Sequence, residues 1–403
     1  MPIKRDTINL LVKDRKMRII LFTGKGGVGK TTLAAATAYL SALKGHKTLI
    51  ISADAAHSLS DSFEMKLFNT PRLIAPCLYG QEVNPQEEIE KKWGKIKKYL
   101  VAFFSSQGID TIEAEEMSVF PGMEELFSLM AIHNYHRKNE YEVIIVDCAP
   151  TGDTLRFLSA PEITNWYLKH IFPLQRTAAK AVRPVANRVL PFPFPEDEVF
   201  ETMKNLTTQL AEMREILADP EKTSIRLIIN PEKMVIKEAQ RAYTFFNLFG
   251  YVVDMIIVNR LIPADVQDVY FQKWKDIQKI YMRMIRECFS PLPIFTSDLF
   301  SQEIVGKELL EKMARKVYDK KDPTQLFFAQ KPITVEKTDG GFDMFLYLPF
   351  VERQDIDLFQ KGEELSVKIG LYKRNILLPQ ILQSYSVKGA RFEKERLKIS
   401  FRQ

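Results

Sequence analysis

The stretch MRIILFTGKGGVGKTTLAAATAYL, residues 17–40, decides the fold of this protein. Residues 17–23 form a continuous apolar, β-branched run, which is typical of a buried parallel strand. A glycine-rich turn follows, and an alanine- and leucine-rich segment then predicts a helix from Thr31 to about Leu43. The run TLIIS at 48–52 is the next predicted strand. Together these segments predict one strand–helix–strand unit of a parallel sheet.

The turn itself, GKGGVGKTT, satisfies the pattern GxxxxGK[ST] of a phosphate-binding loop. Glycines let backbone N–H groups close around a polyanion, and the helix that begins here adds the positive end of its dipole. In this pattern Lys30 reaches the β- and γ-phosphates of a nucleotide, and the Thr31 hydroxyl binds Mg²⁺. The residues expected to hold the nucleotide are those of the loop and the first helical turn: Gly26, Gly27, Val28, Gly29, Lys30, Thr31 and Thr32.

Three further charged residues lie near this loop: Lys25 and Asp54 are, with Lys30, the candidates for catalysis, and Asp147 is, with Thr31, a candidate for the metal. Lys25 either adds positive charge at the phosphates, in its own subunit or across a dimer, or is a solvated loop lysine. Asp147 ends the apolar run VIIVD, where it would hold Mg²⁺ or its water, or only cap the next turn. Asp54 follows the strand at 48–52, at the sheet edge where doubly wound sheets bind ligands. There it either orients the attacking water or makes an Asx turn or N-cap.

The rest of the chain up to residue 320 continues this alternation. Further apolar runs recur at 143–147, 226–230 and 255–259. Strands that alternate with helices predict an α/β fold with a doubly wound, mostly parallel sheet. Two longer helical segments, about 87–135 and 163–220, are interpreted as insertions that form a helical subdomain. The expected P-loop domain is therefore 17–320.

The character of the sequence changes after residue 320. Residues 321–332 are interpreted as a linker, and short alternating runs separated by Pro and Gly fill 333–403. This pattern predicts a small all-β sandwich. Because so small a sandwich is marginally stable alone, we expect it to pack on the larger domain or on a partner.

Composition narrows the class of protein. The 403 residues carry 57 Lys and Arg against 51 Asp and Glu, a net charge of +6, and no nucleic-acid partner is expected. Residues 366–403 hold nine basic and two acidic residues, so a contact with an acidic partner or an anionic membrane would be sought there first. No run of about 18 apolar residues and no signal peptide is present, and a reduced, cytoplasmic location is expected. The cysteines are too few and scattered for a disulfide framework: Cys77, Cys148 and Cys288.

Several segments resemble one family of ATPases. KGGVGKTT is the deviant P-loop, with a signature lysine, of the MinD, ParA, nitrogenase-iron-protein and ArsA class. SADAAHSLSDSF (52–63) and VDCAPTGDTLRFLSAPE (146–162) resemble switch I and switch II of ArsA-like ATPases. That group includes arsenical-pump ATPases and the targeting factors for tail-anchored membrane proteins. VNRLIP (258–263) is similar to the segment whose Asn contacts adenine, and the resemblance covers roughly residues 17–320.

The resemblance implies Mg²⁺-dependent ATP hydrolysis by a homodimer that closes and opens with nucleotide. Lys25 would reach the phosphates of the partner subunit, and Lys30 and Thr31 would act as argued above. Asp54 would position the hydrolytic water, and Asp147 would support Mg²⁺ and couple to switch II. The remaining nucleotide contact, with the adenine, would come from Asn259. A γ-phosphate can hold switch loops that relax after hydrolysis.

Three departures from the family pattern matter. Ala53 and Ala55 stand where switch I usually has Thr and Pro, and Asp153 stands where switch II usually has His. The stretch PADVQDVYFQKW after the VN motif has no CxxC pair, so a zinc-clamped dimer is not expected. Arsenite needs clustered thiolates, and the three cysteines lie far apart in the sequence.

The tail has a resemblance of its own. FLYLPFVERQDIDL (345–358), LSVKIGLYKRNILLP (365–379) and GARFEKERLKISF (389–401) resemble the α-crystallin domain of small heat-shock proteins. Phe350 stands where a Gly is common. The tail is interpreted either as a chaperone-like interaction sheet or as a packing domain without a client, since fold does not give function.

Residues 163–195 form a possible client surface. They contain no acidic residue and mix basic with apolar side chains at helical spacing. The resemblance implies a hydrophobic client groove here, whereas the residues alone favour an ordinary subdomain helix that packs its apolar stripe.

Three functions remain. The first is an ATP-driven homodimeric chaperone for hydrophobic or tail-anchored membrane-protein segments. The second is the ATPase subunit of an arsenite or other anion pump, which would need a membrane partner. The third is a positioning switch of the ParA/MinD type. The predicted helical insertions and the switch II sequence favour the first two, and the missing cysteine cluster favours the first.

Overall fold

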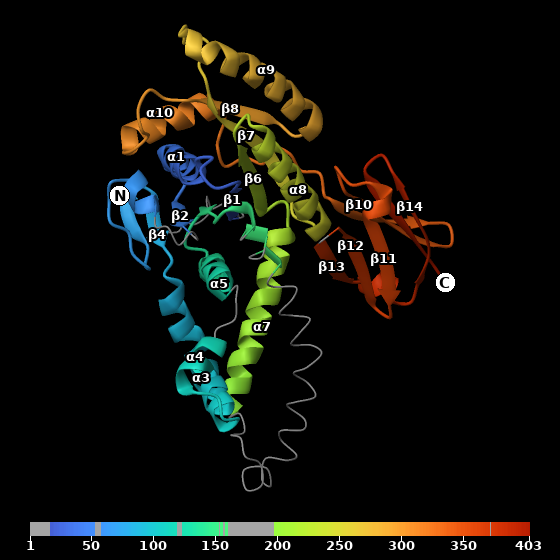
Figure 1. Cartoon of the computed structure of the whole chain (residues 1–403). Helices are drawn as coiled ribbons and strands as arrows, with labels where there is room; N and C mark the ends of the chain where they lie inside the picture. Colours follow the sequence, from blue (N-terminus) through green and yellow to red (C-terminus); the bar gives the residue numbers. More distant parts are fainter. Residues whose placement is uncertain are drawn as a thin grey trace, which may run out of the picture.

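The computed structural model describes residues 17–52, 58–118, 123–152, 154–155, 158–159, 197–370 and 372–403. Its centre is an eight-stranded sheet with the order β3-β4-β2-β5-β1-β6-β7-β8 (Figure 1). The strands are β1 (Arg18–Thr23), β2 (Thr48–Ser52), β3 (Arg72–Ala75), β4 (Leu78–Glu82), β5 (Val143–Asp147), β6 (Thr223–Ile229), β7 (Val253–Leu261) and β8 (Ile294–Asp298). Every neighbouring pair is parallel except β3 with β4. The predicted mostly parallel α/β sheet is therefore confirmed.

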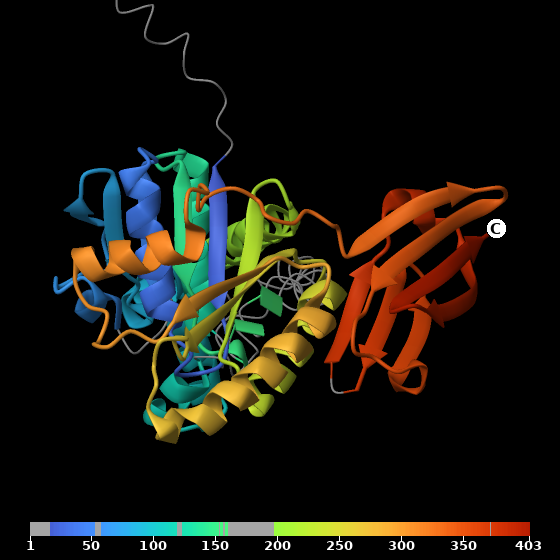
Figure 2. The ribbon, with the colours of Figure 1, turned by 90° about the horizontal axis from the view of Figure 1, so that it is seen from above.

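Helices cover both faces of this sheet, which explains why β1, β2, β5 and β6 are buried at every position. The covering helices are α1 (Lys30–Leu43), α8 (Lys233–Phe249), α9 (Val269–Phe289) and α10 (Lys307–Tyr318). Helices α1 and α10 pack against each other. The connection from β1 to β2, through α1, runs toward one edge of the sheet, whereas those from β6 to β7 and from β7 to β8, through α8 and α9, run toward the opposite edge. Because such connections are right-handed, α8 and α9 lie on the face opposite α1 (Figure 2).

A helical part extends from one end of the sheet (Figure 1). Its helices are α3 (Pro85–Ser106), α4 (Thr111–Met117), α5 (Met123–Lys138) and α7 (Asp197–Ala218). They enclose a second, small core of Trp93, Ile96, Met130, Val199, Leu206 and Leu210. These helices largely coincide with the two predicted insertions, although α3 begins at Pro85 and α5 ends at Lys138. Residues 160–196, which include the possible client surface, lie outside the described residues.

The tail consists of two antiparallel sheets with the orders β14-β15-β10-β9 and β11-β12-β13. Its elements are β9 (Ile333–Thr338), β10 (Gly341–Tyr347), β11 (Ile356–Lys361), β12 (Glu364–Ile369), β13 (Tyr372–Leu377), the short α11 (Gln380–Gln383), β14 (Ser386–Glu393) and β15 (Arg396–Arg402). In β15 the alternate residues Leu397, Ile399 and Phe401 are buried. This period of two is the pattern that predicted an all-β module, and the prediction is confirmed.

The tail packs on α8, as expected for so small a β module. The Thr244 hydroxyl donates a hydrogen bond of 2.6 Å to the carbonyl oxygen of Pro349. The Arg374 guanidinium donates to the carbonyl oxygen of Leu248, and the rings of Phe245 and Tyr372 meet edge to face at 5.2 Å. The buried apolar residues of the sheet domain and the tail form one continuous cluster.

The backbone conformation and packing of Phe350 show why a phenylalanine can stand where small heat-shock domains commonly have glycine. Its φ of +63° is the left-handed conformation that favours glycine, the residue common at this position in the proteins that the tail resembles. Here the phenyl ring lies 5.7 Å from the ring of Phe289 and 6.4 Å from that of Tyr243. The side chain therefore adds packing against the sheet domain at a position with strained backbone.

The segment between the two parts is anchored rather than loose. Arg18 donates to the carbonyl oxygen of Thr324 at 3.3 Å, and Arg226 donates to that of Gln325 at 3.3 Å. Arg226 is fully buried and lies 3.5 Å from a carboxylate oxygen of Asp254. Burial lowers the pKa of Arg18 to about 10, although the Asp254 charge opposes that shift. Two arginines, on the central strands β1 and β6, thus hold the predicted linker in place.

Several basic residues of the tail form ion pairs or are buried within the molecule. Lys398 and Arg402 lie 2.7 and 3.1 Å from the Asp343 carboxylate, and Arg374 is buried against α8. Burial alone would raise the pKa of Asp343, but hydrogen bonds from Lys398, Ser400 and Arg402 lower it. Part of the excess positive charge of the tail is therefore neutralised or buried and cannot contact a partner.

Candidate nucleotide site

The phosphate loop joins β1 to α1 and needs two of its glycines for lack of space. A Cβ on Gly24 would collide with the carbonyl oxygen of Ile228, at the end of β6. Gly29 has a φ of +93°, and a Cβ there would meet the side-chain amide of Asn259. Around Gly26 and Gly27 no heavy atom lies within 4 Å of where a Cβ would be. The loop is thus packed at both ends and open in the middle, as a phosphate cradle must be.

The first turn of α1 offers backbone donors and two functional side chains. No side chain caps this helix, which begins after Gly29, so its first N–H groups remain available to a ligand. Lys30 is 6% exposed, whereas Lys25 is half-buried on the loop. The Thr31 hydroxyl lies 3.1 Å from the Ser58 hydroxyl of α2 (Ser58–Ser62). α1 therefore touches the helix that follows the switch I-like segment.

Asp147 lies at the meeting point of three strand ends. It is fully buried, and it is level with Phe22 of β1 on one side and with Ser52 of β2 on the other. The phosphate loop leaves β1 directly after Thr23, and the switch I-like segment leaves β2 directly after Ser52. Because parallel strands end at the same edge, a carboxylate at the end of β5 lies between both loops.

The switch II-like segment is tied to β1. Thr23 donates through its hydroxyl to the Thr154 hydroxyl at 3.0 Å, and Thr154 donates to the carbonyl oxygen of Ala149 at 2.7 Å. The backbone N–H of Cys148 donates to the carbonyl oxygen of Phe22 at 3.0 Å. Thr23 and Thr154 are both buried. The end of β1, which leads into the phosphate loop, is therefore in direct contact with the segment after β5.

Asn259, on β7, is brought to the loop from far along the chain. Its side-chain amide donates to the carbonyl oxygen of Val28 at 2.8 Å, and it is 4% exposed. The structure thus places Asn259 with Gly29, Lys30 and Thr31 around one loop. Thr32 follows in the same helical turn.

Two residues of interest lie outside the described residues: Asp54 and Asp153. The same holds for Ala53 and Ala55. Helix α2, which follows Asp54 in the chain, is held by Glu82, whose carboxylate accepts from the Ser60 N–H and the Ser60 hydroxyl, both at 2.8 Å.

Two contacts at the site were not predicted from the sequence. Ser58 stands next to Thr31, and Thr154 next to Thr23. Both residues lie within the segments that resemble the switches, so the resemblance was a signal for their segments. The resemblance did not indicate which residues these hydroxyls would contact, because a pair of hydroxyl groups produces no periodic pattern in the sequence.

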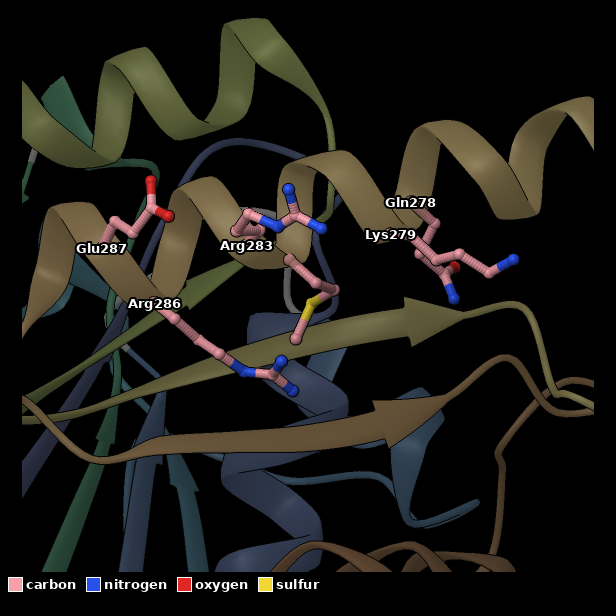
Figure 3. A pocket seen from close by; sticks show the side chains of 6 residues that line it. Gln278, Lys279, Arg283, Arg286 and Glu287 are labelled. Atoms are coloured by element: carbon pink, nitrogen blue, oxygen red, sulfur yellow. The ribbon is translucent and has the colours of Figure 1, made fainter.

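Nothing in the described part of the chain resembles a thiolate site. No group of three or more His, Cys, Asp or Glu residues there could hold a metal ion. Cys77 is exposed, Cys148 is buried directly after β5, and Cys288 lies on α9; none of the three forms a disulfide. A hollow of about 480 Å³ lies elsewhere, along α9, and is lined by Gln278, Lys279, Met282, Arg283, Arg286 and Glu287 (Figure 3).

A mostly parallel sheet whose first strand leads through a GxxxxGK[ST] loop into a buried helix defines a P-loop nucleoside triphosphatase. Residues 17–319 match the family described as "Anion-transporting ATPase", and residues 339–401 match the "HSP20-like domain found in ArsA". The chain belongs to this ArsA-type ATPase family. The resemblances of both parts are thereby confirmed.

Individual relatives agree with this assignment. The chain is 40% identical over 393 residues to "Putative arsenical pump-driving ATPase 1" of Aquifex aeolicus. The matched residues make up 95% of this chain and 99% of the relative. It is also 40% identical to a "Putative arsenical pump-driving ATPase" of Chlorobaculum tepidum, over 96% of each chain. "ATPase get3" of Pyrenophora tritici-repentis is 29% identical over 76% of this chain and 93% of its own. The protein is accordingly a nucleotide-binding enzyme that hydrolyses ATP.

None of the helices in the described ranges has the length and apolar character of a membrane span.

Proposed function

We propose that this protein is a Mg²⁺-dependent ATPase that works as a nucleotide-switched homodimer and binds hydrophobic segments of membrane proteins. One observation carries the switch. Hydroxyl pairs join the phosphate loop region to both switch-like segments, Thr31 to Ser58 and Thr23 to Thr154. Since a γ-phosphate can hold such segments in one position, its loss on hydrolysis can release both.

The residues at the site fit Mg²⁺ and ATP. Mg²⁺ prefers hard oxygen ligands, and the Thr31 hydroxyl and the Asp147 carboxylate, directly or through water, supply them at the same sheet edge. When bound, Mg²⁺ neutralises charge on the phosphates. Lys30 and the free N–H groups of the first turn of α1 would bind the phosphates, and Gly26, Gly27, Val28, Gly29 and Thr32 would shape the loop. Asn259 would turn from Val28 to the adenine.

Catalysis needs a group that orients water, and we assign this to Asp54. It follows Ser52 by two residues, and Ser52 is level with Asp147 in the sheet. We assign Lys25 to the phosphates of a second subunit, because its own loop already has Lys30. The cytoplasm is the proposed location, in keeping with three cysteines that form no disulfide.

For the client, the helical part extends from one end of the sheet (Figure 1). The neighbouring segment 163–195 has apolar and basic residues without an acidic one. We propose that hydrophobic or tail-anchored segments bind there. A positioning switch of the ParA/MinD type is less consistent with this helical part, and domain limits of 17–320, 321–332 and 333–403 remain part of the proposal.

A second candidate is the ATPase subunit of an anion pump with a membrane partner. The names of the 40% identical relatives, which read "arsenical pump-driving ATPase", favour it. The absence of clustered metal-ligating residues within the described ranges weighs against an arsenite site. Stimulation of wild-type ATP turnover by arsenite would support the pump, and we expect none.

The variant Asp54→Asn tests the mechanism. We expect it to abolish phosphate release while a fluorescent ATP analogue still binds, because only the orientation of water is lost. Asp61→Asn, which neutralises an exposed aspartate of α2, is the matched control and should hydrolyse normally. Undiminished turnover in Asp54→Asn would remove Asp54 from the mechanism.

The same variant tests the client. A hydrolysis-dead dimer should retain its cargo, so hydrophobic-segment proteins should be enriched on Asp54→Asn captured from cells. Capture of a pump channel would replace the chaperone proposal by the second candidate. Light scattering with and without ATP would show whether the nucleotide changes the dimer.

A further inference from the structure

The residue that follows the end of α8 contacts the switch II-like segment. The Tyr251 hydroxyl donates a hydrogen bond of 2.7 Å to the carbonyl oxygen of Leu158, and both residues are buried. Leu158 belongs to the described part of that segment. Because Thr154 is bonded to Thr23, the segment is held at two points, one at β1 and one at the end of α8.

The position of Tyr251 is fixed by the way in which α8 ends. Gly250 has a φ of +83°, the left-handed conformation that terminates many helices. The N–H of Gly250 donates to the carbonyl oxygen of Asn247 at 3.0 Å, and that of Tyr251 donates to the carbonyl oxygen of Phe246 at 2.8 Å. The backbone that carries the Tyr251 ring is therefore part of the helix end.

The same helix end contacts the tail. The Arg374 guanidinium of β13 donates to the carbonyl oxygen of Leu248 and lies over the ring of Phe249, 5.4 Å from its centroid. A Cβ on Gly250 would lie 3.5 Å from Ile333, the first residue of β9. Figure 1 shows α8 between the sheet domain and the tail. The consecutive residues 248–251 thus contact the tail and the switch II-like segment together.

The other end of α8 follows a strand that contacts the phosphate loop. Helix α8 begins shortly after β6, and the carbonyl oxygen of Ile228 in β6 occupies the space where Gly24 of the loop would carry a Cβ. Most of α8 is buried, and a closely packed helix moves as a unit because protein interiors are not continuously deformable. Each end of α8 is therefore in a place to respond to the nucleotide.

Packing alone would require a partner for the Tyr251 hydroxyl, since buried tyrosines form a hydrogen bond wherever they lie. Two observations about this bond go beyond that requirement. Its acceptor belongs to the segment that resembles a nucleotide switch, and its donor follows directly on the residues that hold the tail. The bond is thus a direct connection between the switch II-like segment and the contact surface of the tail.

We propose that Tyr251 is a positioning residue that couples the switch II-like segment to the tail, so that the bound nucleotide alters how firmly the tail docks on α8. This inference rests on the proposed nucleotide switch. Coupling between two sites is reciprocal, so a docked tail in turn favours one nucleotide over the other. The tail then regulates the ATPase domain, a role that neither a client-binding sheet nor a passive packing domain has.

Limited digestion of the full chain with trypsin tests the coupling. Lys320, Lys321 and Lys331 are exposed in and next to the segment that leads to the tail. Because proteases cut segments that detach transiently, the rate of cleavage there reports how often the tail opens. In wild type this rate should differ by about two- to tenfold between a non-hydrolysable ATP analogue and ADP, the factor that one hydrogen bond can contribute.

The variant Tyr251→Phe keeps the ring and removes the hydroxyl. Cleavage of this variant should occur at the same rate with both nucleotides, although fluorescent analogues of both still bind. The matched control is Tyr79→Phe, which removes the hydroxyl from a half-buried ring of β4 that contacts Tyr141. This control should retain the difference seen in wild type.

A second variant interrupts the connection on the side of the tail. Arg374→Met removes the contact with Leu248, so cleavage should become faster with both nucleotides and the difference between them should shrink. Its control is Lys373→Met, at an exposed position of β13, which should behave as wild type. Circular dichroism shows whether each variant is folded, and Arg374→Met keeps the test decisive if Tyr251→Phe is not.

Three results would overturn the proposal: equal cleavage of wild type with both nucleotides, a difference that persists in both Tyr251→Phe and Arg374→Met, or its loss in Tyr79→Phe as well. Light scattering separates this failure from failure of the proposed function. If nucleotide changes the dimer but not the cleavage, only the coupling is wrong. If nucleotide changes neither, the proposed switch is wrong too.

Discussion

Helices α8 and α9 lie next to each other in the fold and have opposite surroundings. Twelve of the 17 residues of α8 are buried, between the sheet on one side and the tail on the other. Only three of the 21 residues of α9 are buried. Both are amphipathic in sequence, and both follow strands of the same sheet. The difference lies in a partner: α8 has the tail, whereas no described element covers the outward side of α9.

This comparison shows what amphipathicity does and does not establish. A periodic apolar pattern identifies a face that gains from burial, and both helices have one. What buries it depends on an element distant in the chain, such as β13 for α8, or on another molecule. An exposed apolar stripe on a helix is therefore a functional signal only after the fold shows that nothing covers it.

The largest expected effect lies in α8. Phe246 is fully buried, and Phe246→Ala should lower the free energy of unfolding by about 3–5 kcal/mol because it leaves a cavity in the core. Urea denaturation followed by circular dichroism measures the change. A loss below about 1 kcal/mol would mean that α8 is not held as tightly as the comparison requires.

A smaller effect is expected at the contact between α8 and the tail. Arg374→Met removes the hydrogen bond to the carbonyl oxygen of Leu248 and should destabilise the protein by about 1.5–3 kcal/mol. The neighbouring Lys373→Met, at an exposed position of β13, is the control and should change stability little. Limited proteolysis between residues 319 and 332 should become faster in Arg374→Met alone, because the tail would detach more often.

The smallest effect is expected on α9. Ile280 is 62% exposed, so Ile280→Ala should change the free energy of unfolding by less than about 0.5 kcal/mol. The same urea titration measures it. A cost close to that of Phe246→Ala would show that Ile280 is buried in solution, for example in a dimer.

Much of the fold could be predicted from the sequence because its signals are local. The glycine loop, the apolar strands and the period of two in the tail depend on near neighbours in the chain, and all are found where expected. Asp147 was predicted as a Mg²⁺ residue because it ends the apolar run VIIVD, and the structure places it level with Phe22 of β1, next to the phosphate loop.

The contacts that join the site to its surroundings could not be predicted in the same way. Thr31 and Ser58 are 27 residues apart, and Thr23 and Thr154 are 131 apart. Phe350 was noted only as a departure from a pattern, and its packing on Phe289 depends on how the tail meets the sheet domain. Such contacts follow from the arrangement of whole elements, which no short pattern describes.

The sequence by itself determined the phosphate loop, the order of strands and helices and the two-part organisation, because backbone geometry and hydrophobic periodicity act over a few residues. Only the tertiary structure decided which apolar faces meet. It buried α8 between sheet and tail, used the basic Arg374 inside the molecule, and left large apolar side chains of α9, such as Tyr270 and Ile280, exposed in this chain. Burial depends on partners distant in the chain, and their positions are set by the packing of the complete fold.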